Sequence, residues 1–210
     1  MKTDSAQAPR TRGRPRGFDR EQALERAMEL FWRQGYESTS IADLTKAMGI
    51  NPPSLYAAFG DKERLFLEAV ERYGGHSRQT LESILSAAPS ARAAVERLLE
   101  ATARECTDPC HPPGCMIVSA ATNCSAGGAH VQAALAARRR SAEAKVKARI
   151  AHGVKQGELP ARTDCGALAK FYCTVIEGMS IQARDGASRR SLLATAAAAM
   201  RAWPARKANA

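Results

Sequence analysis

The side chains best able to do chemistry in this sequence gather around one proline-rich stretch. Four soft potential ligands or nucleophiles fall within ten residues: Cys106, Cys110, His111 and Cys115. Three prolines and a glycine between 106 and 114 predict a loop there. Thiolates and imidazoles bind zinc, and a cysteine with a lowered pKa reacts with oxidants and electrophiles. A metal site, a thiol sensor and a purely structural loop are therefore the three interpretations.

The spacing favours the structural interpretation. The pattern C-x₃-C-H-x₃-C matches no strong zinc motif, so we expect neither a metal nor any other cofactor. If a thiol is the sensor, Cys106, Cys110 and Cys115 are the candidates. The remaining three cysteines lie in apolar helical surroundings and are interpreted as small core residues: Cys124, Cys165 and Cys173.

Outside the segment 106–115, the sequence contains no group of residues that indicates an enzyme. The four histidines are scattered, and neither a Ser-His-Asp order, an HExxH motif nor a phosphate-binding glycine loop is present. A Cys/His metalloenzyme or redox enzyme would explain the segment 106–115 and nothing else. We therefore do not expect an enzyme.

The elements that would position a functional surface are clearest between Thr39 and Lys62. Apolar residues there recur at helical spacing, and Ser40 with Asp43 has the spacing of a capping box. Gly49 predicts the end of this helix, because glycine adopts the left-handed conformation without steric cost. The stretch therefore begins with a short, well-capped helix.

A second short helix restarts at once. Asn51 is a good N-cap, and Pro52 at the first helical position loses no hydrogen bond. Gly60 predicts its end, and Asp61 caps the helix that follows. A helix, a glycine turn and a helix of this length are typical of a helix-turn-helix, whose second helix enters the DNA major groove.

These helices belong to a longer pattern over residues 19–75. Its members are Ala27, Leu30, Phe31, Gly35, Tyr36, Thr39, Ile41, Ala47, Gly49, Ser54, Leu55, Tyr56, Phe59, Lys62 and Leu65. The pattern resembles the DNA-binding domain of the TetR family of bacterial transcriptional regulators. Ala57-Ala58 departs from it, replacing a bulkier pair. The resemblance implies an all-α fold, with an N-terminal three-helix DNA-binding domain and a larger helical domain for effector binding and dimerisation.

Two groups of side chains are expected to meet the DNA. The start of the second helix brings base edges within reach of Asn51, Pro53 and Ser54. Backbone phosphates are expected to be contacted by Thr39, Ser40, Tyr56 and Lys62.

Residues 1–18 form a basic arm that we expect to be flexible. Residues 1–75 carry 12 basic and 11 acidic side chains, so the positive charge of this part of the chain lies in the arm. The segment RTRGRPRG resembles a minor-groove hook, and Arg12, Arg14 and Arg16 are its candidate contacts. The alternative is a disordered tail that aids solubility.

The rest of the chain, 76–210, is predicted to be helical. A helix at about 61–85 is expected to join it to the DNA-binding domain. Further helices are expected at about 89–105, 115–124, 129–156, 163–184 and 188–203. The resemblance implies an effector pocket beside the loop 106–114 and the helix that follows it. Its expected lining is Cys115, Met116, Val118, Phe171 and Val175.

The last two predicted helices carry a broad apolar face and an alanine run. We expect them to bury this face against a second copy as a four-helix bundle. The alternative is that they complete the core of one chain. The resemblance to a dimeric family favours the homodimer.

Composition fits this assignment. The chain has 210 residues, 45% of them hydrophobic and 25% charged, with a formal net charge of +10. No apolar run is long enough for a membrane span, and the N-terminus lacks the apolar segment of a signal peptide, so we expect a cytoplasmic protein. The leading hypothesis is a ligand-responsive repressor that binds a double-stranded operator and releases it on binding a small effector. The alternative is a regulator that senses oxidants, electrophiles or a metal through its cysteines.

Overall fold

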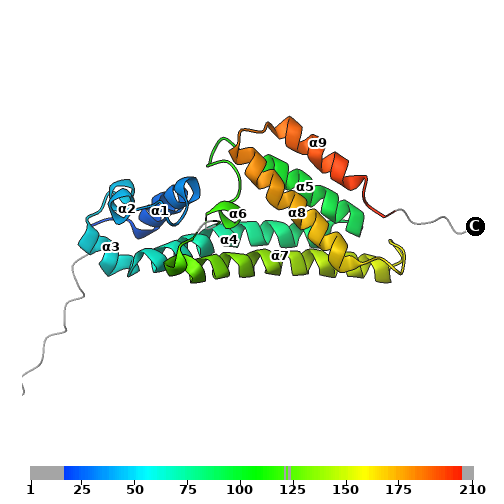
Figure 1. Cartoon of the computed structure of the whole chain (residues 1–210), viewed down its shortest axis with the longest axis horizontal. Coiled ribbons are helices and arrows are strands. Elements are labelled where there is room, and N and C mark those ends of the chain that lie inside the picture. The colour runs from blue at the N-terminus through cyan, green and yellow to red at the C-terminus, as the bar shows by residue number, and fades with distance from the viewer. Residues whose placement is uncertain (1–16, 121, 123, 205–210) are drawn as a thin grey trace, which may run out of the picture.

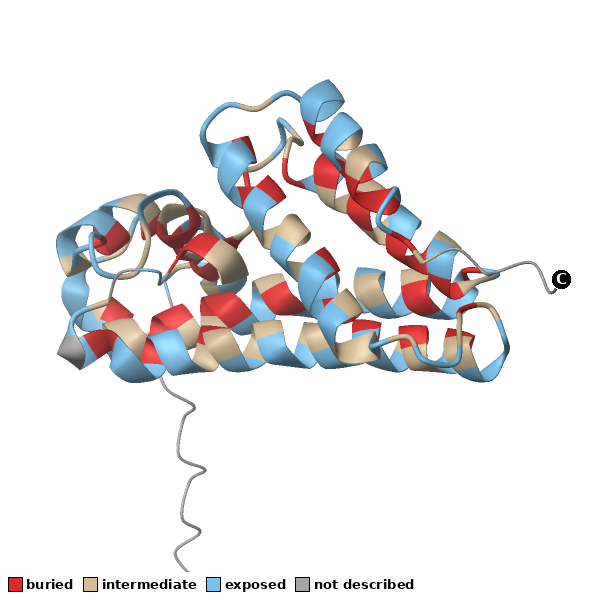
Figure 2. Cartoon of the chain, turned by 45° about the vertical axis from the view of Figure 1, so that its right-hand side comes forward, coloured by how far each residue is buried: buried red, intermediate tan, exposed pale blue. Residues whose placement is uncertain are grey.

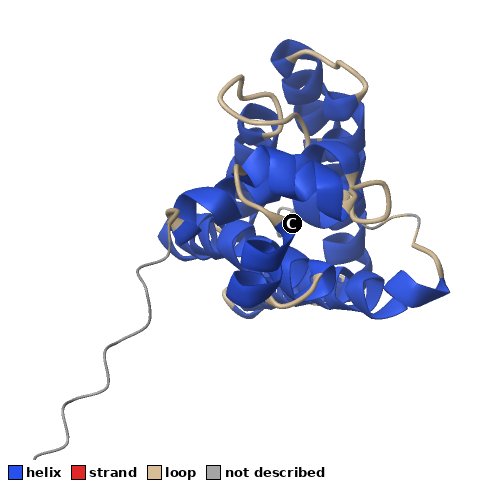
Figure 3. Cartoon of the chain, turned by 90° about the vertical axis from the view of Figure 1, so that its left-hand side faces the viewer, coloured by secondary structure: helices blue, strands red, loops and turns tan. Residues whose placement is uncertain are grey.

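A computed structural model describes residues 17–120, 122 and 124–204 of the chain. Throughout these residues the secondary structure consists of helices joined by loops and turns (Figure 3). This confirms the expected all-α fold. None of the described helices is both long enough and apolar enough to cross a membrane.

The N-terminal helices begin and end where the local signals predict. They are α1 (Arg20–Gln34), α2 (Ile41–Met48) and α3 (Pro52–Phe59). Asp19 caps α1, Ser40 and Asp43 form the capping box of α2, and the Asn51 side chain accepts the Ser54 N–H at 2.9 Å. Gly49 has φ of 69°, the left-handed conformation that ends α2.

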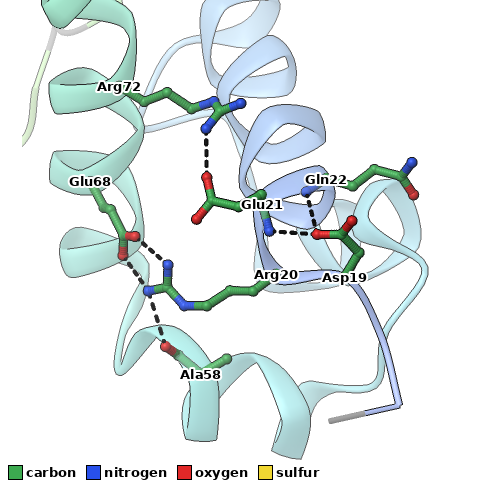
Figure 4. A network of polar contacts seen from close by, with 7 residues as sticks. All are labelled: Asp19, Arg20, Glu21, Gln22, Ala58, Glu68 and Arg72. Carbon is green, nitrogen blue, oxygen red and sulfur yellow. Dashed lines mark hydrogen bonds and ion pairs between the residues drawn. The ribbon is translucent and has the colours of Figure 1, made fainter.

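Helix α1 is fastened to α3 and α4 by a polar network (Figure 4). Arg20 donates to both carboxylate oxygens of Glu68, at 2.5 and 2.7 Å, and to the Ala58 carbonyl at 3.4 Å. Its guanidinium also lies 4.4 Å from the centroid of the Phe59 ring. Residues 17–75, which include α1, α2, α3 and the first half of α4, are called the head below.

Helix α4 (Lys62–Ala87) joins the head to the rest of the molecule. Its 26 residues span about 39 Å at 1.5 Å per residue. The first turns supply buried Leu65, Phe66 and Ala69 to the core of the head. In Figure 1 the same helix continues alongside α7 (Ala129–Lys155), away from the head.

The remaining helices form the body, residues 76–204. They are α5 (Ala91–Glu105), the short α6 (Met116–Ser119), α7, α8 (Cys165–Arg184) and α9 (Arg189–Met200), with a 3-10 turn, η1, at Ala126–Gly128. Helix α5 packs against α8 and α9. Figure 2 shows buried residues where helices face one another and exposed residues along their outer sides.

Several helix boundaries in the body differ from the sequence prediction. Helix α5 begins at Ala91 rather than Pro89, because the Ser90 side chain accepts the Ala93 N–H. The apolar helix expected over 115–124 is only four residues long. The Ala120 carbonyl just after it accepts the Tyr36 N–H of the head at 2.7 Å. Helices α8 and α9 are also shorter than the expected 163–184 and 188–203.

Candidate DNA-binding surface and effector cavity

One face of α3 is anchored and the other is open. Leu55 and Phe59 are buried in the core of the head, whereas Pro53 and Tyr56 are exposed. Half of the Tyr56 side chain, 51%, is accessible. Ser54 is half-buried, with its N–H held by the Asn51 cap. The N-terminal turn of α3 therefore brings together the three residues expected to read bases.

Lys62 lies beside the segment that leads into α2. Its Nζ is 4.5 Å from the centroid of the Tyr36 ring and donates to the Glu37 carbonyl at 3.4 Å. Partial burial lowers the pKa of Lys62. Ser40 is exposed, but its hydroxyl and N–H both donate to the Asp43 carboxylate, which lowers the pKa of Asp43.

The structure corrects the expectation for Thr39. This side chain is fully buried, and its hydroxyl donates to the Gly35 carbonyl at 2.6 Å. It therefore satisfies a backbone carbonyl at the turn after α1 and is not exposed to a phosphate in this structure. Two exposed cations that the sequence prediction omitted lie on neighbouring elements, Lys46 in the last turn of α2 and Arg64 in the first turn of α4. Their positions within one turn of Gly49 and of Asp61 are the sequence signal that could have indicated them.

The head and the arm carry opposite net charges. Residues 17–75 contain seven basic and ten acidic side chains, whereas residues 1–16 contain five basic and one acidic. A negatively charged domain repels phosphate unless its cations are placed locally. The expected minor-groove arginines, Arg12, Arg14 and Arg16, lie outside the described residues.

The body contains a cavity of about 710 Å³ between α4, α5, α6, α7 and α8. Aliphatic side chains from all five helices form much of its wall: Leu81, Ile84, Leu98, Val118, Val146 and Ile176. Its volume is within the range of small-molecule sites in proteins, about 300–1,000 Å³.

Two of the five expected lining residues, Cys115 and Val118, face this cavity, and three do not. Met116 is fully buried in the core shared with the head. Phe171 is 41% exposed, and Val175 packs against the core of the body. Helix α8 is apolar on several sides, so its sequence does not reveal which side faces the cavity. The residues that do are Cys173, Ile176, Glu177 and Ser180.

Three thiols line the cavity: those of Cys106, Cys115 and Cys173. Burial raises the pKa of Cys106 to about 12, that of Cys173 to about 11, and that of Cys115 as well. At neutral pH these are therefore protonated thiols. Cys110 is exposed instead. In the described part of the chain no group of three His, Cys, Asp or Glu side chains is placed to hold a metal ion.

The cations of the cavity wall already have partners. Glu71 accepts from Arg78 at 2.7 Å and pairs with Arg138, and these contacts lower the pKa of Glu71. A Cβ at Gly74 would lie 2.8 Å from the Arg138 guanidinium, so glycine permits this approach. Further along, Lys145 pairs with Glu82. The cavity consequently offers a ligand aliphatic surface and thiols rather than free positive charge.

A second exposed surface lies on the outer side of α8. Phe171 and Ile181 are 41% and 39% exposed, and between them a Cβ on Gly178 would meet no atom within 4 Å. On α9, Ala194 and Ala197 are also exposed. The exposed apolar side of α8, called the α8 face below, belongs to one of the two helices expected to form the dimer.

Comparison with known proteins identifies the family to which the chain belongs. The family model described as "Bacterial regulatory proteins, tetR family" matches residues 23–69, and "Tetracyclin repressor-like, C-terminal domain" matches residues 91–203. The chain is 37% identical over 206 residues to the HTH-type transcriptional repressor ComR of Escherichia coli (strain K12), covering 97% of this chain and 98% of that protein. It is 36% identical over 191 residues to BdcR of the same organism, covering 90% and 91%.

A solved structure extends the likeness to three dimensions. A cysteine mutant of the TetR family regulator CifR, complexed with 26bp double-strand operator DNA, superposes with a TM-score of 0.88 at 46% identity. The match covers 91% of this chain and 100% of that one. The resemblance drawn from residues 19–75 is thereby confirmed and extends over the body. The chain belongs to the TetR family of bacterial helix-turn-helix proteins, and is a DNA-binding transcription regulator rather than an enzyme.

Proposed function

We propose that this chain is a homodimeric repressor that binds a pseudo-palindromic operator and releases it when a small effector enters the body cavity. One observation carries the proposal: α4 belongs to the core of the head through Leu65 and Phe66, and to the wall of the cavity through Leu81 and Ile84. A ligand that favours one position of this helix therefore changes the placement of the head.

Operator recognition is assigned to the open face of α3. Asn51, Pro53 and Ser54 read base edges, with Pro53 limited to apolar contact such as a thymine methyl. Ser40, Tyr56 and Lys62 hold phosphates, and the arginines at 12, 14 and 16 enter the minor groove. ComR and BdcR are named repressors, and CifR was crystallised with operator DNA, which supports this role.

The dimer is assigned to the α8 face. The structure has three exposed large hydrophobic residues among those it describes, and two of them, Phe171 and Ile181, lie on α8. Burying such a face against a symmetry-related copy gives a two-fold dimer, which can present two α3 helices to successive half-sites.

The effector is proposed to be small and mainly apolar, without negative charge. The wall is largely aliphatic, and its cations are engaged by Glu71 and Glu82 or, for Arg139, by the Ile117 carbonyl at 2.7 Å. Release requires that the effector bind the DNA-free arrangement more tightly than the DNA-bound one.

A second candidate is covalent sensing by the cavity thiols. It is favoured by the convergence of Cys106, Cys115 and Cys173 on one cavity. It ranks below non-covalent binding, because burial raises the pKa of all three thiols and leaves little reactive thiolate at neutral pH.

Operator binding is tested with DNA from upstream of the protein's own gene and of neighbouring genes, by fluorescence anisotropy. We expect one fragment to bind specifically, and Tyr56→Ala to weaken that binding. Lys155→Ala, which alters an exposed lysine at the far end of α7, is the control and should bind normally. Failure of every fragment to bind above the level of random DNA would contradict the proposal.

The thiol candidate is tested by replacing Cys106, Cys115 and Cys173 with serine. We expect this variant to bind the operator and to respond to an apolar effector as the wild type does. The Cys110→Ser variant, altered at an exposed thiol, is the matched control. If an alkylating electrophile released wild-type protein from DNA but not the triple variant, covalent sensing would replace non-covalent binding as the mechanism.

A further inference from the structure

His111, in the loop 106–115, reaches the head. Its ring stacks on Trp32 of α1, with centroids 4.7 Å apart and planes inclined by 24°. The Nε2 atom lies 3.4 Å from the Glu105 carboxylate, and Nδ1 lies 2.9 Å from the Pro112 carbonyl. The ring therefore lies between the end of α5 and its own loop, its Nε2 atom makes no hydrogen bond among the described residues, and its face covers a side chain of the head.

Tyr73 of α4 is the other aromatic neighbour of Trp32. Its ring packs edge-on against the indole, with centroids 4.8 Å apart. Tyr73 also lines the cavity, where its hydroxyl is next to the Cys115 thiol. Burial, with a smaller contribution from Cys115, raises the pKa of Tyr73 well above its ordinary value. Trp32, Tyr73 and His111 are called the aromatic stack below.

Both ends of the loop belong to the cavity wall. Glu105 and Cys106 line the cavity at one end and Cys115 at the other. The Gly114 N–H donates to the Cys106 carbonyl at 2.9 Å, and the Cys115 N–H to the Ser180 hydroxyl at 2.8 Å. A displacement of the wall at any of these points therefore moves the loop that carries His111.

The loop is also pressed closely against α8. Gly114 has φ of +83°, and a Cβ there would lie 2.7 Å from the Ser180 carbonyl oxygen. Only glycine combines this conformation with this approach. The loop consequently follows α8 and the cavity wall instead of moving independently of them.

The indole of Trp32 is held in place by packing alone. It is 4% exposed, and its Nε1–H has no hydrogen-bond acceptor among the described residues. A buried donor without a partner costs free energy, so any arrangement that gives this N–H an acceptor competes with the one observed. The packing of Trp32 against its neighbours is therefore suited to a switch between two positions of the indole.

We propose that the aromatic stack, through the contact of His111 with Trp32, transmits occupation of the cavity from the loop to α1, and that this connection to the head adds to the one through α4. Trp32 and His111 are positioning residues in this assignment, since they couple the cavity wall to α1 and touch neither the DNA nor the effector. The inference rests on the effector role proposed above for the cavity. It adds the residues through which that cavity acts on the head.

The test fills the cavity from within, so that no effector has to be known. Ala101→Phe on α5 and Ala142→Phe on α7 each add a ring at a position that lines the cavity, and neither residue belongs to the stack. Operator affinity is measured for each substitution, alone and combined with His111→Ala. His111→Phe, which keeps a ring able to stack, is the matched control.

We expect cavity filling to change operator affinity by about tenfold in the wild-type and His111→Phe backgrounds, within the usual range of allosteric coupling. In the His111→Ala background the change should fall below about threefold, while His111→Ala alone binds the operator normally. Equal changes in all backgrounds would overturn the stack as the connection and leave the cavity's role intact. No change in any background would overturn the cavity's role, and the inference with it.

The fluorescence of Trp32 supplies a second measurement. Its response to cavity filling would not depend on His111 if His111 had only a structural role. The chain has two tryptophans, so Trp203→Phe leaves Trp32 as the reporter. We expect Ala101→Phe or Ala142→Phe to shift its emission when His111 is present and to shift it much less with His111→Ala. An emission unchanged by cavity filling in the His111 background, in variants whose operator affinity has changed, would contradict the proposal.

Discussion

Two neighbours compete with DNA phosphates for the Lys62 ammonium: the Tyr36 ring and the Glu37 carbonyl. This ammonium is held near the start of α2, so we expect it to meet a phosphate with little loss of side-chain entropy. Lys62→Ala should weaken binding to all sequences alike and lower the salt slope by about one unit per half-site. Salt titrations of operator and random DNA measure this, with Lys155→Ala as the control. A changed base preference at an unchanged salt slope would contradict the assignment.

Ser54 differs from Lys62 in that its contribution should depend on sequence. Its N–H is held by Asn51, which fixes the backbone and leaves the hydroxyl as the variable group. We expect Ser54→Ala to relax base preference at one or two positions per half-site, at about 1–3 kcal/mol. Selection from a randomised site measures this. Ser40→Ala, in the cap of α2, is the comparison, and it should lower stability by about 1 kcal/mol without altering the selected bases.

At the scale of elements, the arm compensates for a head whose acidic residues outnumber its basic ones. Deleting residues 1–16 should weaken operator binding and lower the salt slope by up to about four units per protomer, one for each unit of net positive charge lost. Replacing Arg12, Arg14 and Arg16 by lysine keeps the charge but weakens contacts in a narrow minor groove. That variant should keep most of the salt slope and lose preference for A·T-rich flanks. Unchanged binding after the deletion would favour the solubilising tail.

Helix ends in the head could be predicted from sequence because their causes are local. Asp19, Ser40 and Asn51 each cap backbone within three residues, and Gly49 ends α2 through its own dihedral angles. The length of α6 could not be predicted in this way. The Ala120 carbonyl after it is bonded to the Tyr36 N–H, a contact between distant parts of the chain.

The candidate site shows the same division between local and distant causes. The open turn at the start of α3 follows from its cap and its prolines, so the candidate readout residues could be grouped from sequence. Thr39 was misplaced because its burial depends on how the chain turns after α1. Phe171 was misplaced because α8 contacts the body core, the cavity and solvent with apolar residues on each side. Periodicity identifies such a helix without saying which neighbour each side meets.

At the scale of the molecule, the α8 face predicts a dimer. Gly178 and Gly75 both lie inside helices, and a Cβ added to either would meet no atom within 4 Å, so each tolerates a larger side chain within one chain. Gly178→Leu should obstruct close approach of a second copy, whereas Gly75→Leu, on α4, should not. We expect a monomer's mass and much weaker operator binding for Gly178→Leu only, measured by light scattering and anisotropy. A dimer in both variants would place the interface elsewhere.

The core of the head is not made by the head alone. Met116 and Ala120 after the loop, and Val131 and Leu135 of α7, belong to the same buried cluster as Phe31. A recombination event that joined this head to another regulator near residue 75 would leave these places empty or filled by side chains of the wrong shape. Loss of one such large side chain from a core lowers the free energy of unfolding by about 2–5 kcal/mol. New pairings of operator and effector are therefore expected to evolve in this lineage by substitution within one gene, or by crossovers that carry α6 and the start of α7 along with the head.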